Sequence, residues 1–214
     1  MISIKVCGMR DPENIGQVVY AGADIIGFIF FSGSKRYVGE NPDNTLFSRI
    51  PETVKKAGVF VNEVPEKICM LSGKCKLDLI QLHGTESPHV CEALRYTGLQ
   101  VIKAIGISDR SDFRTLDAYK DSCDFFLFDT ASVQYGGTGV KFDWKILNDY
   151  QLQVPFFLSG GIALDDTVRI LELNHPSFFG VDINSRFEIS PGLKDAQLVG
   201  EFITKIRQFK YTDQ

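Results

Sequence analysis

The chain has 214 residues, of which 44% are hydrophobic and 23% are charged, with a formal net charge of -4 at pH 7. This composition predicts one globular domain spanning residues 1–214, and it excludes an intrinsically disordered chain. Because the sequence has no basic run, it also excludes nucleic acid and an anionic membrane as main partners.

Short apolar segments rich in Ile, Val and Phe recur about every 25 residues and predict eight buried strands. In chain order these are residues 2–7, 24–31, 57–61, 77–82, 100–105, 124–129, 155–158 and 178–183. Continuous apolar strands are typical of a parallel sheet that is covered on both faces.

Amphipathic segments between the strands predict helices. They cover residues 12–20, 65–71, 86–96, 111–119, 164–173 and 198–209, and residues 42–50 give the weakest helical pattern. Asp11 and Pro12 resemble an N-cap followed by a first-turn proline. The alternation of strand and helix favours the α/β class and a single, parallel, eight-stranded (β/α)8 TIM barrel.

An open doubly wound sheet is the structural alternative. Such a sheet usually carries a G-x-G-x-x-G motif directly after its first strand, whereas here the sequence reads Cys7-Gly8-Met9-Arg10. The run Gly136-Gly137-Thr138-Gly139 is too short for that motif and follows a later strand. The sequence therefore favours the barrel.

The N-terminal sequence and the spacing of the cysteines indicate where in the cell the protein is found. The first eight residues run directly into strand-like sequence, without the apolar stretch and cleavage site of a secretory signal. The five cysteines are not paired as C-x-x-C, which favours neither a disulfide framework nor a zinc site. We expect a cytoplasmic protein that uses no metal.

Cys7 closes the first predicted strand, at the barrel end where active sites lie. Free cysteines are commonly buried and inert, which is one interpretation of this residue. However, Gly8 permits a close approach of backbone or ligand. A thiol of ordinary pKa, about 8.5, is a workable general base if its surroundings favour the thiolate. Cys7 is therefore the candidate base.

Asp129 closes the sixth predicted strand, after the apolar residues 125–128. These apolar neighbours should raise the carboxyl pKa by desolvation and let the group donate a proton. The alternative is an aspartate that caps a helix or orders a loop. A thiol base and a carboxylic acid on different strands would hold a substrate between them, and they predict isomerase chemistry.

Two further positions predict anion binding. Gly160 and Gly161 follow the seventh strand, and Asn184 and Ser185 follow the eighth, where barrels often bind phosphate through backbone N–H groups. Tight turns alone would also use such residues. Arg36 is either a solvated surface charge or a planar fork for a carboxylate. The predicted ligand is a sugar phosphate that carries a second anion.

Short motifs follow one another in a fixed order along nearly the whole chain. They are Lys5-Val6-Cys7-Gly8-Met9, Gly27-Phe28-Ile29-Phe30, Ser34-Lys35-Arg36-Tyr37-Val38, Gly58-Val59-Phe60-Val61, Gln81-Leu82-His83-Gly84, Phe128-Asp129-Thr130, Gly136-Gly137-Thr138-Gly139, Phe142-Asp143-Trp144, Leu158-Ser159-Gly160-Gly161 and Val181-Asp182. Each motif alone is weak, but the ordered set resembles the phosphoribosylanthranilate isomerase family.

The resemblance implies the Amadori rearrangement of N-(5-phosphoribosyl)anthranilate to 1-(2-carboxyphenylamino)-1-deoxyribulose 5-phosphate in tryptophan biosynthesis, without metal or organic cofactor. It implies that Asp129 protonates the furanose ring oxygen and that Cys7 removes the proton from C2. It further implies that Arg36 holds the anthranilate carboxylate and that Gln81 and Asp182 line the substrate pocket. The last two loops would hold the phosphate.

One departure from the family pattern concerns the loop after the eighth strand. The family often has Ser-Ser-Gly there, whereas this chain has Asn184-Ser185-Arg186, which leaves the detailed phosphate contacts open. The loop after the second strand also lacks the proline that is common in the family. Neither departure affects the acid or the base.

Two other functions remain as alternatives. Another phosphate-binding barrel enzyme, such as an indole-glycerol-phosphate synthase or a pentose-phosphate epimerase, would share the last two loops but not the pair of Cys7 and Asp129. A non-catalytic barrel that binds a phosphorylated ligand is the other. We expect a small-molecule substrate and no obligate protein partner, and we interpret His83 as a hydrogen-bonded structural histidine.

Overall fold

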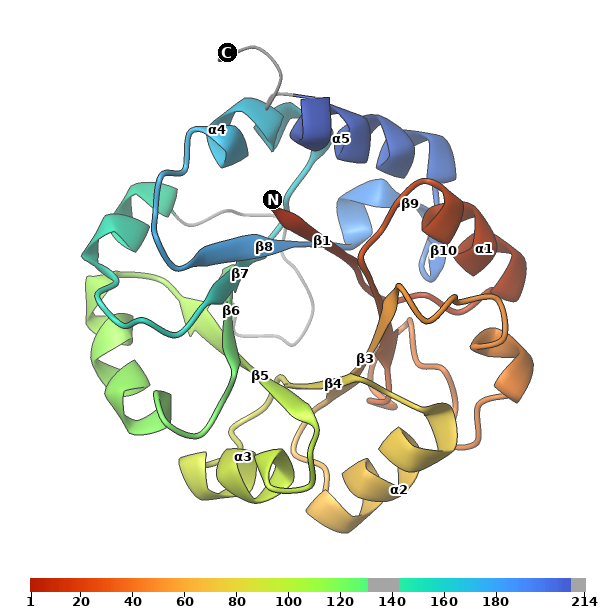
Figure 1. Cartoon of the computed structure of the whole chain (residues 1–214), viewed down its shortest axis with the longest axis horizontal. Helices are drawn as coiled ribbons and strands as arrows, with labels where there is room; N and C mark the ends of the chain where they lie inside the picture. The colour runs from red at the N-terminus through yellow and green to blue at the C-terminus, as the bar shows by residue number, and fades with distance from the viewer. Residues whose placement is uncertain (131–142, 209–214) are drawn as a thin grey trace.

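The computed structural model describes residues 1–130 and 143–208, and in this part of the chain eight parallel strands form a closed barrel (Figure 1). The strands are β1 (Ser3–Val6), β2 (Ile25–Ile29), β3 (Lys55–Phe60), β4 (Leu79–Leu82), β5 (Gln100–Ile107), β6 (Phe125–Thr130), β7 (Phe156–Leu158) and β8 (Phe178–Ile183). They follow one another around the barrel in chain order, and β1 closes it by pairing with β8. The predicted (β/α)8 fold is confirmed.

Helices surround the barrel (Figure 1). The α-helices are α1 (Pro12–Tyr20), α2 (Pro65–Cys75), α3 (Pro88–Arg95), α4 (Thr167–Leu171) and α5 (Ala196–Gln208). The 3-10 helices are η1 (Asn44–Leu46), η2 (Arg110–Tyr119), η3 (Trp144–Asp149), η4 (Leu164–Asp166) and η5 (Ser185–Phe187). Asp11 caps α1 as predicted, because its side chain accepts a hydrogen bond from the backbone N–H of Asn14. No helix in the described residues is long and apolar enough to cross a membrane.

Several helical predictions need correction. The segment 111–119 is a 3-10 helix, and within it Asp112 accepts hydrogen bonds from the backbone N–H groups of Ser108 and Asp109. Such local bonds compete with the α-helical pattern. The segment 164–173 is divided into η4 and α4, and only three residues of 42–50 are helical. Residue 209 and the glycine run at 136–139 lie outside the described residues.

Part of the barrel interior is filled by a cluster of buried apolar side chains. The cluster consists of Ile25, Ala57, Leu79, Ile102, Ala104, Leu127 and Phe157. Side chains that face one way along a strand recur every second residue. Gln81 and Asp129, two residues beyond Leu79 and Leu127, therefore point into the barrel nearer its carboxyl end.

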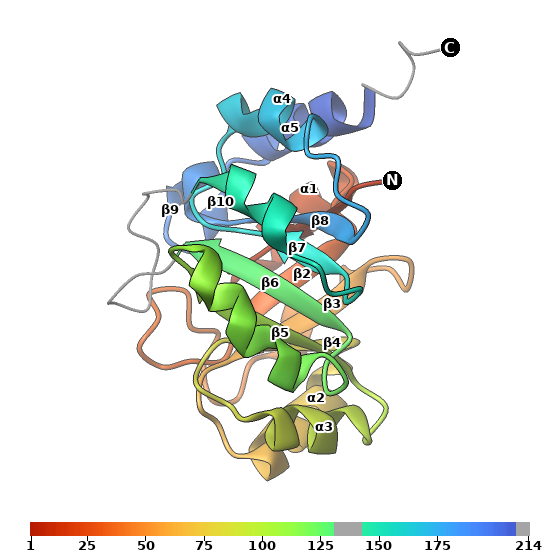
Figure 2. The ribbon, with the colours of Figure 1, turned by 90° about the vertical axis from the view of Figure 1, so that its left-hand side faces the viewer.

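An antiparallel hairpin that the sequence analysis did not predict follows β8. It consists of β9 (Glu188–Ser190) and β10 (Leu193–Lys194). Figure 2 shows it at the end of the barrel opposite the N-terminus of the chain. The hairpin is attached to α1, because the Asn14 side chain donates to the carbonyl of Lys194 and accepts from its backbone N–H. It therefore adds two polar residues, Glu188 and Lys194, to the carboxyl rim.

Candidate active site

Asp129 is partly buried near the end of β6. Its Oδ1 accepts a hydrogen bond of 2.8 Å from the backbone N–H of Thr130. Burial raises the pKa of Asp129 to about 6, although this hydrogen bond opposes the rise. The upward shift predicted for this carboxyl is present, and Asp129 can hold a proton close to neutral pH.

Cys7 comes directly after β1 and lies beside a buried ion pair. Lys5, on the same face of the chain, contacts Asp182 of β8 with 2.9 Å between Nζ and Oδ1. Burial opposes the charge of Lys5, but attraction to Asp182 and Cys7 outweighs it and raises the pKa of Lys5. Lys5 therefore remains an ammonium group next to the thiol.

The pKa of the Cys7 thiol is raised. Burial is the largest cause of the rise and the Asp182 carboxylate adds to it, whereas the ammonium groups of Lys5 and Lys194 act in the opposite direction. A general base requires an environment that favours the thiolate, and overall this environment does not. It nevertheless supplies two cations that can stabilise a thiolate once it forms. Gly27 of β2 makes room for the sulfur, since a Cβ there would lie 2.9 Å from Cys7 Sγ.

Arg36 is held by an acidic residue of the hairpin. Its Nε and Nη2 donate to the two carboxylate oxygens of Glu188 at 2.8 and 2.6 Å. Burial opposes the charge of Glu188, but hydrogen bonds from Arg36 and Lys194 outweigh it and lower its pKa to about 2. Arg36 is therefore not a solvated surface charge. Because Glu188 uses one edge of the guanidinium, a ligand carboxylate would bind the Nη1–Nη2 edge.

Lys194 links this pair to the loop after β8. Its buried Nζ donates to Glu188 Oε1 at 2.7 Å and to Asn184 Oδ1 at 2.6 Å. Gly8, with φ of 77°, packs against the same groups, since a Cβ there would lie 2.5 Å from Arg36 Cδ and 2.9 Å from Asn184 Oδ1. The hairpin, the loop after β2 and the end of β1 therefore meet at one place.

The loop after β7 packs directly on the acid. Gly160 and Gly161 have φ values of 93° and 69°, which favour glycine. A Cβ at Gly160 would lie 2.5 Å from Thr130 Oγ1 and 3.0 Å from Asp129 Oδ1. Ser185 begins η5 in the neighbouring loop after β8. The joint role of these two loops in phosphate binding stays a prediction.

Gln81, predicted from the resemblance to line the substrate pocket, contacts His83. The distance between Gln81 Nε2 and His83 Nδ1 is 2.7 Å, and His83 Nε2 lies 3.6 Å from Asp129 Oδ2. Burial comes first among the effects that lower the pKa of His83 to about 4, followed by the charges of Lys5 and Lys103. His83 is therefore neutral, and it faces the acid.

Sequence reasoning placed the predicted residues on the rim but missed Glu188 and Lys194. The two are adjacent on the hairpin, yet Glu188 lies 152 residues along the chain from its partner Arg36. No local pattern connects positions so far apart. The turn residues Pro191 and Gly192 were the only local signal of a hairpin here.

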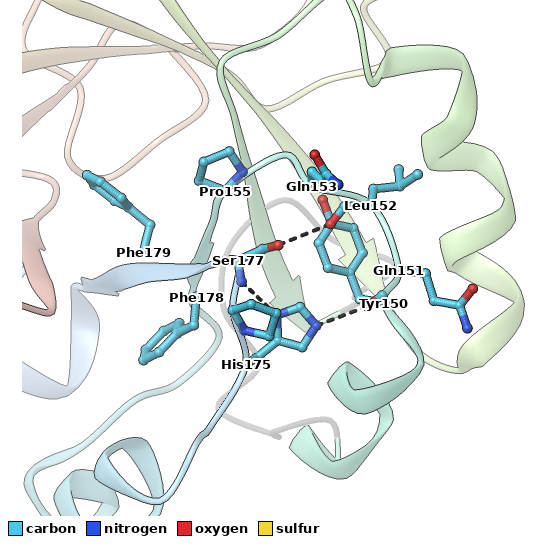
Figure 3. Close-up of a pocket in the computed structure, with 10 residues that line it drawn as sticks. Tyr150, Gln151, Leu152, Gln153, Pro155, His175, Ser177, Phe178 and Phe179 are labelled. Atoms are coloured by element: carbon cyan, nitrogen blue, oxygen red, sulfur yellow. Dashed lines mark hydrogen bonds between the residues drawn. The ribbon is translucent and has the colours of Figure 1, made fainter.

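A pocket of about 670 Å³ lies at the other end of the barrel, before β7 and β8 (Figure 3). Two of its polar side chains are hydrogen-bonded within the protein, His175 Nε2 with the carbonyl of Tyr150 and Ser177 Oγ with the carbonyl of Leu152. It contains neither Cys7 nor Asp129. The acid, the thiol and the cations all lie at the carboxyl rim, which is the candidate active site. Among the described residues, no cluster of three or more His, Cys, Asp or Glu could hold a metal ion.

A closed (β/α)8 barrel with such a polar carboxyl rim defines the class of protein, a barrel enzyme. Residues 4–205 match the family described as N-(5'-phosphoribosyl)anthranilate (PRA) isomerase. The chain belongs to this family.

Relatives with that name are similar over nearly their full length. The one from Phocaeicola vulgatus is 45% identical over 205 residues, which cover 96% of this chain and 98% of the relative. The one from Parabacteroides distasonis is 45% identical over 204 residues, which cover 95% of this chain and 92% of the relative.

Solved structures of the family share the fold. The phosphoribosyl anthranilate isomerase from Thermotoga maritima superposes with a TM-score of 0.86 and 32% identity, covering 96% of this chain and 98% of that one. A second structure was solved in complex with reduced 1-(o-carboxyphenylamino)-1-deoxyribulose 5-phosphate. It superposes with a TM-score of 0.82 and 30% identity over the same shares of the two chains.

Proposed function

We propose that this chain converts N-(5-phosphoribosyl)anthranilate to 1-(2-carboxyphenylamino)-1-deoxyribulose 5-phosphate, with Asp129 as acid and Cys7 as base. The observation that carries the proposal is the place of these two groups. Cys7 directly follows β1 and Asp129 lies near the end of β6, so both groups lie at the carboxyl end of the barrel, close to the buried pair of Lys5 and Asp182. The family membership and the relative solved with a reduced product analogue support the same reaction.

The first half of the reaction opens the ring. The Asp129 carboxyl donates its proton to the furanose ring oxygen, the bond from C1 to that oxygen breaks, and the lone pair of the amine nitrogen forms a C1–N double bond. The raised pKa of Asp129 keeps part of the carboxyl protonated for this step.

The second half moves a proton from carbon. The Cys7 thiolate removes the proton from C2, the electron pair of that bond forms the C1–C2 double bond, and the electrons of the C1–N double bond return to nitrogen. The resulting enolamine tautomerises to the ketone. Lys5 and Lys194 stabilise the thiolate, because their charges oppose the effect of burial on the thiol.

Binding uses the two anion positions. The Nη1–Nη2 edge of Arg36 holds the anthranilate carboxylate while Glu188 fixes the guanidinium. Backbone N–H groups around Gly160, Gly161, Asn184 and Ser185 hold the phosphate. Asp182 lines the pocket and keeps Lys5 in place. The proposal includes a cytoplasmic location, which cell fractionation would test.

The deciding experiment follows the fluorescence decay of phosphoribosylanthranilate, made in place from anthranilate and phosphoribosyl pyrophosphate. We expect fast decay with the native protein and a loss of about 10²- to 10⁴-fold in Cys7→Ser and in Asp129→Asn, because each removes one proton transfer. Circular dichroism and thermal unfolding show whether each variant is folded. Decay no faster than the spontaneous reaction with folded native protein would refute the proposed function.

A further inference from the structure

His83 is placed to act on the acid. It follows β4, and its backbone N–H donates to the carbonyl of Phe60 in β3 at 2.8 Å, which anchors it to the barrel. Its Nε2 is 3.6 Å from Asp129 Oδ2. This distance lies just beyond hydrogen-bond length, and catalytic hydrogen bonds commonly tighten as substrate binds.

Gln81 determines which ring nitrogen of His83 carries the proton. The Gln81 amide nitrogen is a donor only, so at 2.7 Å it is placed to donate to His83 Nδ1, which would then carry no proton. A neutral imidazole must then carry its proton on Nε2, the nitrogen that faces Asp129. The pair therefore presents an N–H donor to the carboxyl.

Burial, together with nearby positive charges, keeps His83 neutral. Burial comes first in lowering its pKa to about 4, and the ammonium groups of Lys5 and Lys103 add to this, while the carboxylate of Glu86 opposes it. A neutral imidazole does not take the proton that Asp129 must give to the substrate. It can hold the carboxyl in place without competing for its proton.

The two oxygens of Asp129 have different neighbours. Oδ1 accepts from the backbone N–H of Thr130 and lies against Gly160, whereas Oδ2 faces His83. Contacts to both oxygens restrict rotation of the carboxyl group about its bond to Cβ. A fixed orientation matters, because proton transfer requires the acid to be within hydrogen-bond reach of the ring oxygen.

We propose that Gln81 and His83 form a positioning pair for the general acid, in which Gln81 fixes the imidazole tautomer and the His83 Nε2–H group orients the Asp129 carboxyl. This inference rests on the role proposed above for Asp129 and adds two residues that support that role. It also gives Gln81 a second task beside lining the pocket.

The first test measures the tautomer directly. In protein labelled with ¹⁵N at histidine, the ring nitrogen shifts of His83, assigned by comparison with His83→Gln, distinguish the two neutral forms and the cation. We expect the Nε2–H tautomer at neutral pH, and loss of this preference in Gln81→Leu. An Nδ1–H tautomer or an imidazolium in the native protein would overturn the proposal. This readout does not depend on isomerase activity.

The second test separates positioning from folding. His83→Gln keeps an N–H donor near the Nε2 position, while His83→Leu removes it. We expect kcat to fall about 10- to 100-fold in His83→Leu with KM little changed, and to remain near the native value in His83→Gln. Loss of the donor to the carboxylate should also raise the Asp129 pKa, which the acid limb of the kcat profile reports. His89→Gln, on the exposed face of α3, is the matched control.

The outcomes distinguish this proposal from the proposed function. Equal losses of kcat in His83→Gln and His83→Leu, or a rise in KM alone, would contradict a positioning donor while native activity stands. If the native protein lacks isomerase activity but shows the Nε2–H tautomer, the proposed function fails and the Gln81–His83 geometry stands. Activity of His83→Leu at the native level, with an unmoved acid limb, would refute the pair.

Discussion

Asp129 and Cys7 both have pKa values that disfavour the forms the reaction needs. The mechanism requires a protonated Asp129 and a deprotonated Cys7. Yet the carboxyl pKa is about 6 and the thiol pKa is raised above its ordinary value. Near neutral pH most molecules therefore carry Asp129 as carboxylate and Cys7 as thiol. The share of molecules that have both a protonated Asp129 and an ionised Cys7 is nearly constant between the two pKa values, and it falls at lower and at higher pH.

This order of pKa values predicts opposite pH profiles for the two single variants. In Asp129→Asn the remaining kcat/KM should rise with pH until the thiol is ionised, because only Cys7 then titrates. In Cys7→Ser it should fall above pH about 6, because only the acid remains. The fluorescence assay across pH 5 to about 10 gives both profiles. Parallel profiles in the two variants would contradict the assignment of acid and base.

At the scale of elements, the β9–β10 hairpin positions Arg36. We predict that Glu188→Gln raises KM about 10-fold with kcat changed little, because the guanidinium loses its charged partner and the lost energy lies in substrate binding. Glu40→Gln, at an exposed position near Lys67, is the matched control. Steady-state kinetics decide the matter. An unchanged KM in a folded Glu188→Gln protein would remove the hairpin from substrate binding.

The loop after β7 gives a second prediction at this scale. Gly160→Ala and Gly98→Ala both place a side chain at positive φ, with values of 93° and 88°, which should cost about 1 kcal/mol of stability in each. Gly160→Ala should cost more than this, because its Cβ would lie 2.7 Å from the backbone nitrogen of Thr130. Only at Gly160 would the new Cβ meet Thr130 and Asp129, since a Cβ at Gly98 has nothing within 4 Å. We expect kcat to fall by about 10-fold or more only in Gly160→Ala. Equal activity of the two variants would show that the loop does not position the acid.

At the scale of the whole molecule, a second buried ion pair joins β5 to the segment before α3. Lys103 Nζ lies 2.9 Å from Glu86 Oε2, with side chains 2% and 3% exposed. Glu86 also accepts hydrogen bonds from the backbone N–H groups of Asn62 and Gly84. Both partners are therefore neutralised and hydrogen-bonded, as buried charges must be.

We predict that Glu86→Gln lowers the free energy of unfolding by about 3 kcal/mol, because it leaves the Lys103 charge buried without a counter-ion and turns an amide N–H toward backbone donors. Glu201→Gln in α5 breaks an exposed pair with Lys205 and should cost less than about 1 kcal/mol. Urea unfolding of both variants compares them. Similar losses would mean that the buried pair contributes no more than a surface pair.

The strands were the most predictable part of the fold. All eight predicted strands are present with ends shifted by at most two residues, because strands buried on both faces require continuous apolar sequence. The outer helices were less predictable. In η2 the side chain of Asp112 bonds to nearby backbone, and amphipathic spacing does not reveal whether such bonds will prevail over an α-helix. The expectation of one domain over residues 1–214 stays a prediction.

The linear order of residues was sufficient for the barrel and for the rim positions of Cys7, Asp129 and Asp182, because strand periodicity and strand ends are local properties. The tertiary structure alone decided the partners of those residues. The Lys5–Asp182 pair depends on the pairing of β1 with β8. The ion pair between Arg36 and Glu188 depends on where the hairpin is attached to α1. Such contacts form between residues far apart in the chain, so their distances and pKa values follow from register and burial, which no local pattern contains.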